Sequence, residues 1–222
     1  MSADHPQNDT LTGLLNRKAF QEQYQAALEA ARKMEQPLVF IFLDIDHFLE
    51  VNQSLGHMAG DGVLATVAET MRQTFGETAI LGRYGGDEFV ILLPSVEREA
   101  AFLTLEKLRQ AVEARSTYEY EGKSWQIQVT ISAGLAAFPI DGRSGYELLR
   151  KADQALYRAK AARNQVRLAI EEKLVPKTSH YTQTQLERLT QLAQGQGFTE
   201  AELLREAMDD LLIKYGVNDI LS

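Results

Sequence analysis

The chain has 222 residues and 45% hydrophobic content, enough for one globular domain and a small second unit. It contains no cysteine, which excludes disulfide bonds and thiolate metal sites. The formal charge of -8 argues against general nucleic-acid affinity, because no basic excess is available to neutralise phosphates.

The N-terminal part predicts a turn, a helix and a buried strand. Residues 9–17 form a compact turn, and apolar residues at helical spacing predict a helix from about Arg17 to Met34. Residues 38–43 are continuously apolar, as in a strand buried on both faces. This apolar run is far too short to span a bilayer, and the first ten residues lack a hydrophobic signal region. We therefore expect a soluble cytoplasmic protein without membrane contact.

Two aspartates, Asp44 and Asp46, follow this strand. In open α/β sheets, ligands bind beyond the strand ends, so Asp44 is a candidate site residue. Asp46 need not serve the same site, and it is interpreted as the N-cap of the short helix expected over residues 47–54. A glycine-bounded turn at residues 54–61 then opens a helix to about Phe75. His57 in that turn is interpreted as a hydrogen-bonding turn residue rather than a metal ligand.

The stretch from Arg83 to Pro94 predicts a β-hairpin. Gly85 and Gly86 supply the backbone freedom of its two-residue turn. Two carboxylates, Asp87 and Glu88, follow at once and lead into an apolar strand. Such a pair indicates a cationic ligand at the hairpin tip, although a solvated acidic turn is the alternative.

The following residues predict further alternation of helices and strands. Helices are expected over residues 96–115 and 145–162, and strands over residues 125–135 and 165–169. This alternation indicates an α/β sheet with helices on its faces.

A second unit begins near residue 172, which divides the chain into domains 1–172 and 173–222. A short polar strand is expected at residues 177–181, with helices at residues 184–194 and 199–215 separated by glycines. Thr199 and Glu202 have the spacing of a capping box. A unit this small can hardly bury its apolar faces alone, so we expect it to pack on something or to dimerise.

Five motifs in order and in register resemble the GGDEF-domain diguanylate cyclases. They are residues 9–17 (DTLTGLLNR), 44–52 (DIDHFLEVN), 56–61 (GHMAGD), 83–89 (RYGGDEF) and 152–160 (ADQALYRAK). The resemblance implies an α/β fold with the palm-like sheet of nucleotide cyclases, flanked by helices. It also implies that two GTP molecules, one on each domain of a face-to-face homodimer, condense to cyclic di-GMP and two pyrophosphates.

The resemblance also implies metal ligands and a general base. Mg²⁺ (or Mn²⁺), two ions per active site, would be held by Asp44, Asp87 and the backbone carbonyl of Ile45, in keeping with the preference of magnesium for oxygen ligands. Asp87 or Glu88 would accept the proton of the 3′-hydroxyl, and the family pattern favours Asp87.

The remaining implied contacts are to the substrate. Backbone N–H groups after Asp46 suit the β and γ phosphates, and Asn52 and Asp61 would recognise guanine. A carboxylate that accepts from guanine N1 and N2 favours GTP over ATP. Lys160 corresponds to a phosphate contact, with a solvated helix-end cation as the alternative. The expected substrate-binding residues are therefore His47, Phe48, Asn52, Asp61, Lys160 and Arg163.

Three positions depart from the family pattern. Leu49 stands where a lysine is common, and the segment from Lys160 to Arg163 is one residue shorter than usual, which puts the phosphate contact of Arg163 in doubt. The Arg-x-x-Asp of the family's inhibitory product site is replaced by residues 76–79 (GETA), so we expect no product inhibition by that route.

The C-terminal unit resembles the ribbon-helix-helix dimerisation fold, whose members usually bind DNA through paired strands. Here the outward strand positions are Thr178 and His180, which carry little charge, and residues 171–222 hold nine acids and five bases. We therefore expect this unit chiefly to dimerise the cyclase domains, with DNA binding as a further possibility and a plain helical hairpin packed on the main domain as the alternative. The alternative function is a degenerate GGDEF domain that acts as a GTP- or cyclic-dinucleotide-binding regulator or as a DNA-binding transcription factor.

Overall fold

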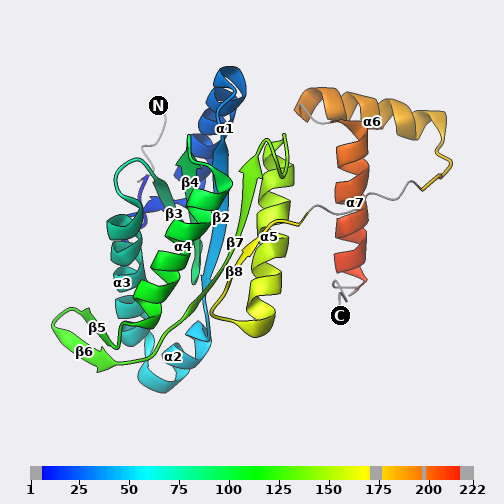
Figure 1. Cartoon of the computed structure of the whole chain (residues 1–222). Helices are drawn as coiled ribbons and strands as arrows, with labels where there is room; N and C mark the ends of the chain where they lie inside the picture. Colours follow the sequence, from blue (N-terminus) through cyan, green and yellow to red (C-terminus); the bar gives the residue numbers. More distant parts are fainter. Residues whose placement is uncertain (1–6, 171–176, 197–198, 216–222) are drawn as a thin grey trace, which may run out of the picture. The chain divides into compact units, whose positions relative to one another are not determined.

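The computed structural model describes residues 7–170, 177–196 and 199–215 (Figure 1). The chain divides into two compact units, Met1–Glu171 and Glu172–Ser222, and each is described by itself. No helix in these described ranges is long and apolar enough to cross a membrane.

The first unit is built on a six-stranded sheet with the order β1-β3-β4-β2-β7-β8. The edge strands β1 and β8 run parallel to their neighbours β3 and β7, and the other pairs are antiparallel. The strands are β1 Leu15–Asn16, β2 Leu38–Ile45, β3 Ile80–Gly85, β4 Glu88–Pro94, β7 Ile131–Phe138 and β8 Val166–Leu168.

Helices cover both faces of this sheet (Figure 1). All eight residues of β2 are buried, and its apolar side chains from Leu38 to Leu43 alternate between two apolar cores. One core lies under α1 (Arg17–Met34) and α5 (Gly145–Ala162), and the other lies under α3 (His57–Phe75) and α4 (Arg98–Glu113). The expected α/β architecture, with helices flanking a central sheet, is confirmed.

Helix α5 lies unusually close to β7 because position 134 is a glycine. A Cβ on Gly134 would meet the backbone nitrogen of Leu156 at 2.1 Å and the carbonyl oxygen of Ala152 at 2.2 Å, both in α5. These distances are far below van der Waals contact. Gly134 therefore allows the short distance between α5 and the sheet.

The strand expected over residues 125–135 is wrong in its bounds. The structure has a separate hairpin of β5 (Thr117–Tyr120) and β6 (Lys123–Gln126), and β7 starts only at Ile131. The turn residues Glu121 and Gly122 both have positive φ, at 47° and 75°. A two-residue turn of this kind suits the right-handed twist of a hairpin.

The second unit contains two helices, α6 (Gln183–Gln196) and α7 (Glu200–Lys214). The expected strand at Lys177–Tyr181 is wrong for this single chain, because residues 177–182 have no regular secondary structure. A lone strand has no backbone partner, and pairing with another strand would be needed to form its ladder. Of the expected glycine break, Gly195 lies within α6, and Gly197 lies outside the described residues.

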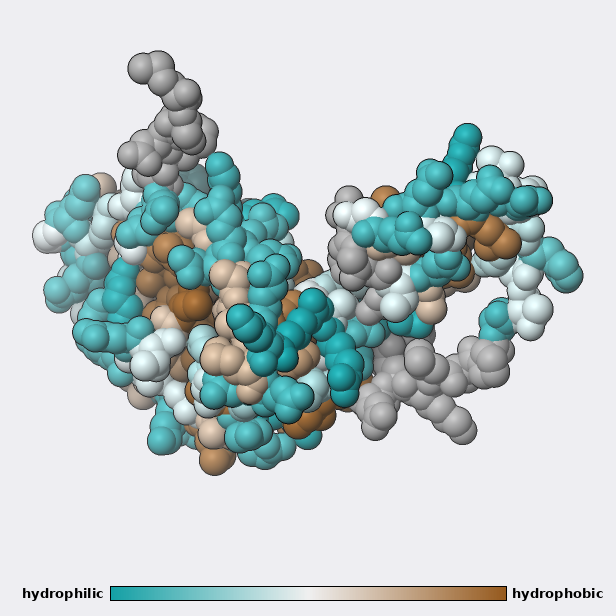
Figure 2. Space-filling model, turned by 90° about the horizontal axis from the view of Figure 1, so that it is seen from above, coloured by the Kyte–Doolittle hydropathy of each residue, from teal (hydrophilic) through white to brown (hydrophobic). Residues whose placement is uncertain are grey.

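Apolar side chains remain at the surface of this second unit. Figure 2 shows hydrophobic residues, in brown, among hydrophilic ones on the face of the unit that it displays. The apolar side chains at the surface come from both helices and from the residues next to them, and they are exposed by more than a third. They are Tyr181, Leu186, Leu192, Met208, Leu211, Leu212 and Tyr215.

Candidate active site

The predicted acidic residues lie at the end of the sheet that is next to α2 (Phe48–Leu55; Figure 1). Asp44 stands near the end of β2, and its register partner on β4 is Glu88. Lys160, in the last turn of α5, donates from Nζ to Asp44 Oδ2 at 2.7 Å. The structure therefore brings together residues 44, 88 and 160, which lie far apart in the sequence.

The electrostatics of Asp44 identify it as the central carboxylate of this group. Burial is the largest effect and raises the pKa of Asp44 to about 6, because its side chain is only 8% exposed. The hydrogen bond and charge of Lys160 oppose this rise, whereas the charges of Asp87 and Glu88 add to it. Lys160 is the one cation among the charges that act on Asp44, whereas Asp87 and Glu88 add two negative charges, and this excess negative charge favours a further cation.

The hairpin tip differs in one respect from the sequence prediction. Its two turn residues are Gly86 and Asp87, whereas Gly85 still belongs to β3 and pairs with Glu88. Gly86 has a φ of 51°, so it is the position that requires glycine. The carbonyl of Asp87 accepts a hydrogen bond from the amide of Ile45 at 3.3 Å, which ties the tip to the end of β2.

Two further residues brace this tip, and the sequence reasoning assigned them no role. Arg83 donates from Nε and Nη2 to the carbonyl of Gly86 at 3.0 and 2.8 Å. Its Nη1 also pairs with the Asp9 carboxylate at 3.2 Å. Burial alone would raise the pKa of Asp9, but hydrogen bonds from Thr12 and the Arg83 guanidinium hold that pKa below its ordinary value. Both residues could have been found from the sequence, because Asp9 lies in the motif at residues 9–17 and Arg83 in the motif at residues 83–89.

Asp46 has a structural position, but its interpretation as a helix cap is wrong. The N-cap of α2 is His47, and no side chain caps that helix. The buried Asp46 carboxylate instead accepts from Thr130 Oγ1 at 2.7 Å, from Ser132 Oγ at 2.8 Å and from the backbone amide of Asn164 at 2.9 Å. Asp46 is therefore held by these three donors, whereas Lys160 bonds Asp44.

The predicted guanine contacts lie where α2 meets α3. Asn52, in α2, packs directly on Gly60 in α3, where an added Cβ would stand 2.1 Å from Asn52 Oδ1. The half-buried Asp61 follows Gly60 in the chain, so the structure places Asn52 beside the turn of helix that carries Asp61. Phe48 packs partly against the core, and the exposed His47 contacts Glu50.

Arg163 differs from Lys160 in its surroundings. It is exposed, it caps the C-terminus of α5, and its φ is 57°. Asn164 follows with a φ of 48°, so two consecutive non-glycine residues are left-handed in the shortened segment. The Arg163 guanidinium makes no hydrogen bond or ion pair with the residues that the structure describes. The structure therefore does not bring Arg163 to the carboxylates.

The donor set at the strand end fits a divalent cation. No three acidic or histidine side chains within the described ranges already converge on one point as a closed metal site. Magnesium needs only one or two carboxylates, however, because phosphates and water complete its shell. Asp44 and Asp87 are carboxylates of this kind, and the backbone of Ile45 lies beside the hairpin tip.

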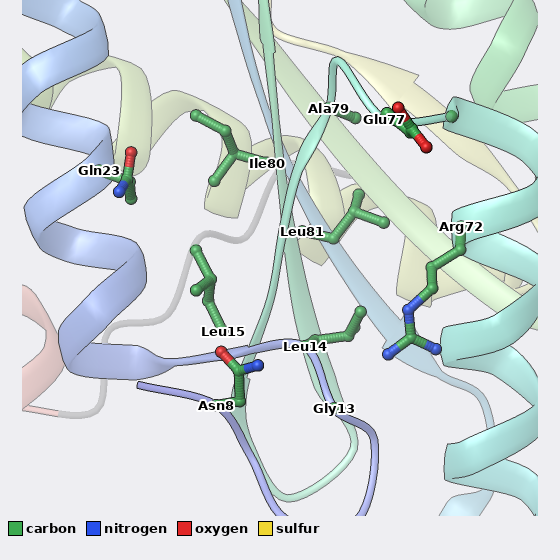
Figure 3. A pocket seen from close by; sticks show the side chains of 11 residues that line it. Asn8, Gly13, Leu14, Leu15, Gln23, Arg72, Glu77, Ala79, Ile80 and Leu81 are labelled. Carbon is green, nitrogen blue, oxygen red and sulfur yellow. The ribbon is translucent and has the colours of Figure 1, made fainter. Parts of the chain in front are cut away.

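A pocket of about 550 Å³ lies elsewhere in the first unit and contains none of the predicted active-site residues (Figure 3). Leu14, Ile80 and Leu81 contribute apolar surface, and Arg72 and Glu77 add charged groups. The segment 76–79, where the family's inhibitory site would be expected, contributes to this lining. The candidate carboxylates and this pocket are therefore separate features.

Comparison with known proteins is consistent with this geometry. The family profile described as "Diguanylate cyclase, GGDEF domain" matches residues 7–165. The chain is 40% identical over 154 residues to the diguanylate cyclase DgcP of Pseudomonas aeruginosa. The aligned region covers 69% of this chain and 22% of that protein. It is 35% identical over 162 residues to the diguanylate cyclase DosC of Escherichia coli, covering 72% of this chain and 34% of that protein. The chain thus spans only about a fifth to a third of these relatives.

Solved structures also match the first unit. The GGDEF domain of DgcB from Caulobacter crescentus, in complex with c-di-GMP, superposes with a TM-score of 0.70 at 32% identity, covering 77% of this chain and 97% of that chain. The active GGEEF domain of a diguanylate cyclase from Vibrio cholerae gives a TM-score of 0.65 at 30% identity, covering 72% and 99%. The family match, the relatives and the shared fold together show that the chain belongs to the diguanylate cyclase, GGDEF domain family.

Proposed function

We propose that the chain is a diguanylate cyclase, which condenses two GTP molecules into cyclic di-GMP and two pyrophosphates. The observation that carries this proposal is the buried Asp44 carboxylate, which is paired with Lys160 and acted on by the charges of Asp87 and Glu88 at one end of the sheet. Several relatives are named as diguanylate cyclases, which supports the same reaction.

Each half of the reaction is a phosphoryl transfer. The 3′-hydroxyl oxygen of one GTP forms a bond to the α-phosphorus of the other, the bond from that phosphorus to the pyrophosphate oxygen breaks, and the hydroxyl proton passes to a carboxylate. Asp87 is the proposed general base, with Glu88 as the second candidate. Lys160 would neutralise phosphate charge, and it already lies beside Asp44.

Divalent metal ions would be held by Asp44, Asp87 and the Ile45 carbonyl, two ions at each site. When bound, Mg²⁺ or Mn²⁺ would neutralise phosphate charge and lower the pKa of the attacking hydroxyl. The buried Asp44 must be ionised to serve, and the neighbouring charges that raise its pKa are those that a bound cation would offset.

Guanine recognition is assigned to Asn52 and Asp61. Their placement on adjoining helices supports this role, because Asn52 packs on the residue before Asp61. A carboxylate can accept from both N1 and N2 of guanine, whereas adenine offers no such pair of donors on that edge. The proposal therefore includes a preference for GTP over ATP.

The second unit is proposed to hold two copies of the chain together. The reaction needs two substrate-bound domains that face each other, and one domain binds one GTP in this scheme. The exposed leucines of α6 and α7, among them Leu192 and Leu211, leave apolar surface that a unit of this size does not bury alone. Light scattering on the whole chain should show a dimer, and Leu192→Glu combined with Leu211→Glu should yield monomers with little product.

Chromatographic identification of the product tests the proposed reaction. Whole chain with Mg²⁺ is incubated with GTP, with ATP and with their mixture, and cyclic di-GMP is expected in the first and third reactions. Asp87→Ala should abolish it while circular dichroism shows the fold retained. A folded wild-type chain that binds GTP but forms no cyclic dinucleotide would contradict the cyclase and support the regulator.

A further inference from the structure

The turn that joins α5 to β8 is held from two sides by contacts at Asn164. Its backbone amide donates to Asp46 Oδ2 at 2.9 Å, at the end of β2. Its side chain accepts from Arg109 Nη1 at 2.8 Å and donates from Nδ2 to Glu113 Oε1 at 2.7 Å, both on α4. Asn164 therefore connects three elements that meet at the active end of the sheet.

The contacts on α4 form a charged support for this turn. Arg109 is largely buried, with 14% of its side chain exposed, and it bonds Glu113 Oε2 at 2.8 Å as well as Asn164. The hydrogen bonds from Arg109 and Asn164 hold the pKa of Glu113 below its ordinary value. Glu106 Oε2 also pairs with Arg109 Nε, at 3.0 Å, and Arg109 links Glu106 to Asn164. Glu113 alone of these two acids bonds the turn directly.

Both ends of this connection lie close in the chain to the functional pair. Asp46 is two residues after Asp44, and Asn164 is four residues after Lys160. The contacts of Asn164 thus restrain the end of α5 against the end of β2, where Lys160 and Asp44 meet at 2.7 Å. Asn164 has a left-handed backbone, with a φ of 48°, which asparagine adopts more readily than most residues other than glycine.

We propose that Asn164 is a positioning residue, which acts with Glu113 to hold Lys160 at the phosphate-binding position. This inference rests on the proposed function, and it adds Glu113 of α4 and Asn164 of the turn after α5 to the residues that place Lys160. Neither Asn164 nor Glu113 touches substrate in this scheme, because each acts through the placement of Lys160. Loss of the support should therefore weaken nucleotide binding more than it slows the chemical step.

Matched variants on α4 test the proposal. Glu113→Ala removes a partner of Arg109 and the bond to the Asn164 side chain, whereas Glu106→Ala removes a partner of Arg109 alone. In the whole chain, Glu113→Ala should raise the KM for GTP on the order of tenfold, with a smaller change in kcat. Glu106→Ala should leave KM near the wild-type value. Glu113→Gln keeps an acceptor for Asn164 and should restore KM in large part.

Asn164→Gly provides a second test that separates position from folding. Glycine adopts positive φ without strain, so this variant should keep most of its thermal stability while losing both side-chain contacts. Its KM for GTP should rise as in Glu113→Ala. The double variant Glu113→Ala/Asn164→Gly should have a KM no higher than that of Asn164→Gly alone. Equal KM values for Glu113→Ala and Glu106→Ala, or an unchanged KM in Asn164→Gly, would overturn the proposal.

A binding readout keeps the inference distinct from the cyclase reaction itself. Calorimetry with Mg²⁺ and a non-hydrolysable GTP analogue should show the same order of affinities, with Glu113→Ala weaker than Glu106→Ala by about tenfold. If the wild-type chain forms no product, but Glu113→Ala still binds the analogue more weakly than Glu106→Ala, the proposed reaction fails and the positioning role stands. Equal affinities of the two variants would refute the positioning role, whatever the activity.

Discussion

Asp44→Asn should make the protein more stable while abolishing its activity. The fold raises the pKa of Asp44 from 3.8 to about 6, which corresponds to about 3 kcal/mol against the ionised form. Because solvent around the half-exposed Lys160 relaxes part of that penalty, we expect a gain of about 1–2 kcal/mol at pH 7. Asparagine is never ionised, and it keeps an acceptor for Lys160.

The stability difference between Asp44→Asn and the wild type should depend on pH. Since the folded state binds the Asp44 proton more tightly than the unfolded state, the contribution of Asp44 is present below pH 3.8 and is lost as the pH rises through about 6. Urea unfolding at pH 4, 5, 6 and 7.5 should therefore show Asp44→Asn gaining on the wild type with rising pH, with a constant difference above about pH 7.

Asp46→Asn is the matched control for this series. Its carboxylate accepts three hydrogen bonds, so the amide should cost about 1–3 kcal/mol. A destabilised Asp44→Asn, or a difference from the wild type that does not change between pH 4 and 7, would refute the electrostatic reasoning about the site.

Three further predictions concern packing, specificity and regulation. Gly134→Ala must displace α5 from β7, since its Cβ would lie 2.1 Å from backbone; we expect a loss of about 1–3 kcal/mol in urea unfolding, and wild-type stability would contradict the close approach. Asp61→Ala should lower kcat/KM for GTP by about tenfold or more while changing weak ATP turnover little, as steady-state kinetics would show; an unchanged GTP-to-ATP ratio would remove Asp61 from base recognition. Added cyclic di-GMP should not inhibit through residues 76–79, so initial rates should follow simple competition with GTP, and inhibition that persists at saturating GTP would contradict this expectation.

Much of the fold could be predicted from local patterns. Helical spacing gave the bounds of α1 and α5, and the unbroken apolar run identified β2 as a strand with both faces covered. The hairpin of β5 and β6 was missed because its strands are short and polar, although Glu121-Gly122 between them is a turn signal. Short strands depend on their partners more than on their own residues.

The candidate site could be predicted only for residues that belong to the family motifs. Asp44, Glu88 and Lys160 converge as expected from their motifs, which local spacing alone does not establish. The role of Asp46 was not predictable, because its partners Thr130 and Asn164 lie 84 and 118 residues away in the chain. Whether a carboxylate faces a ligand or buried donors is decided by such distant contacts.

The most direct test of the account is a crystal structure of the whole chain with Mg²⁺ and a non-hydrolysable GTP analogue. We predict a metal ion between the carboxylates of Asp44 and Asp87, the triphosphate beside Lys160, and the guanine between Asn52 and Asp61. A nucleotide bound elsewhere on the chain, or metal held without these two carboxylates, would contradict the proposed active site.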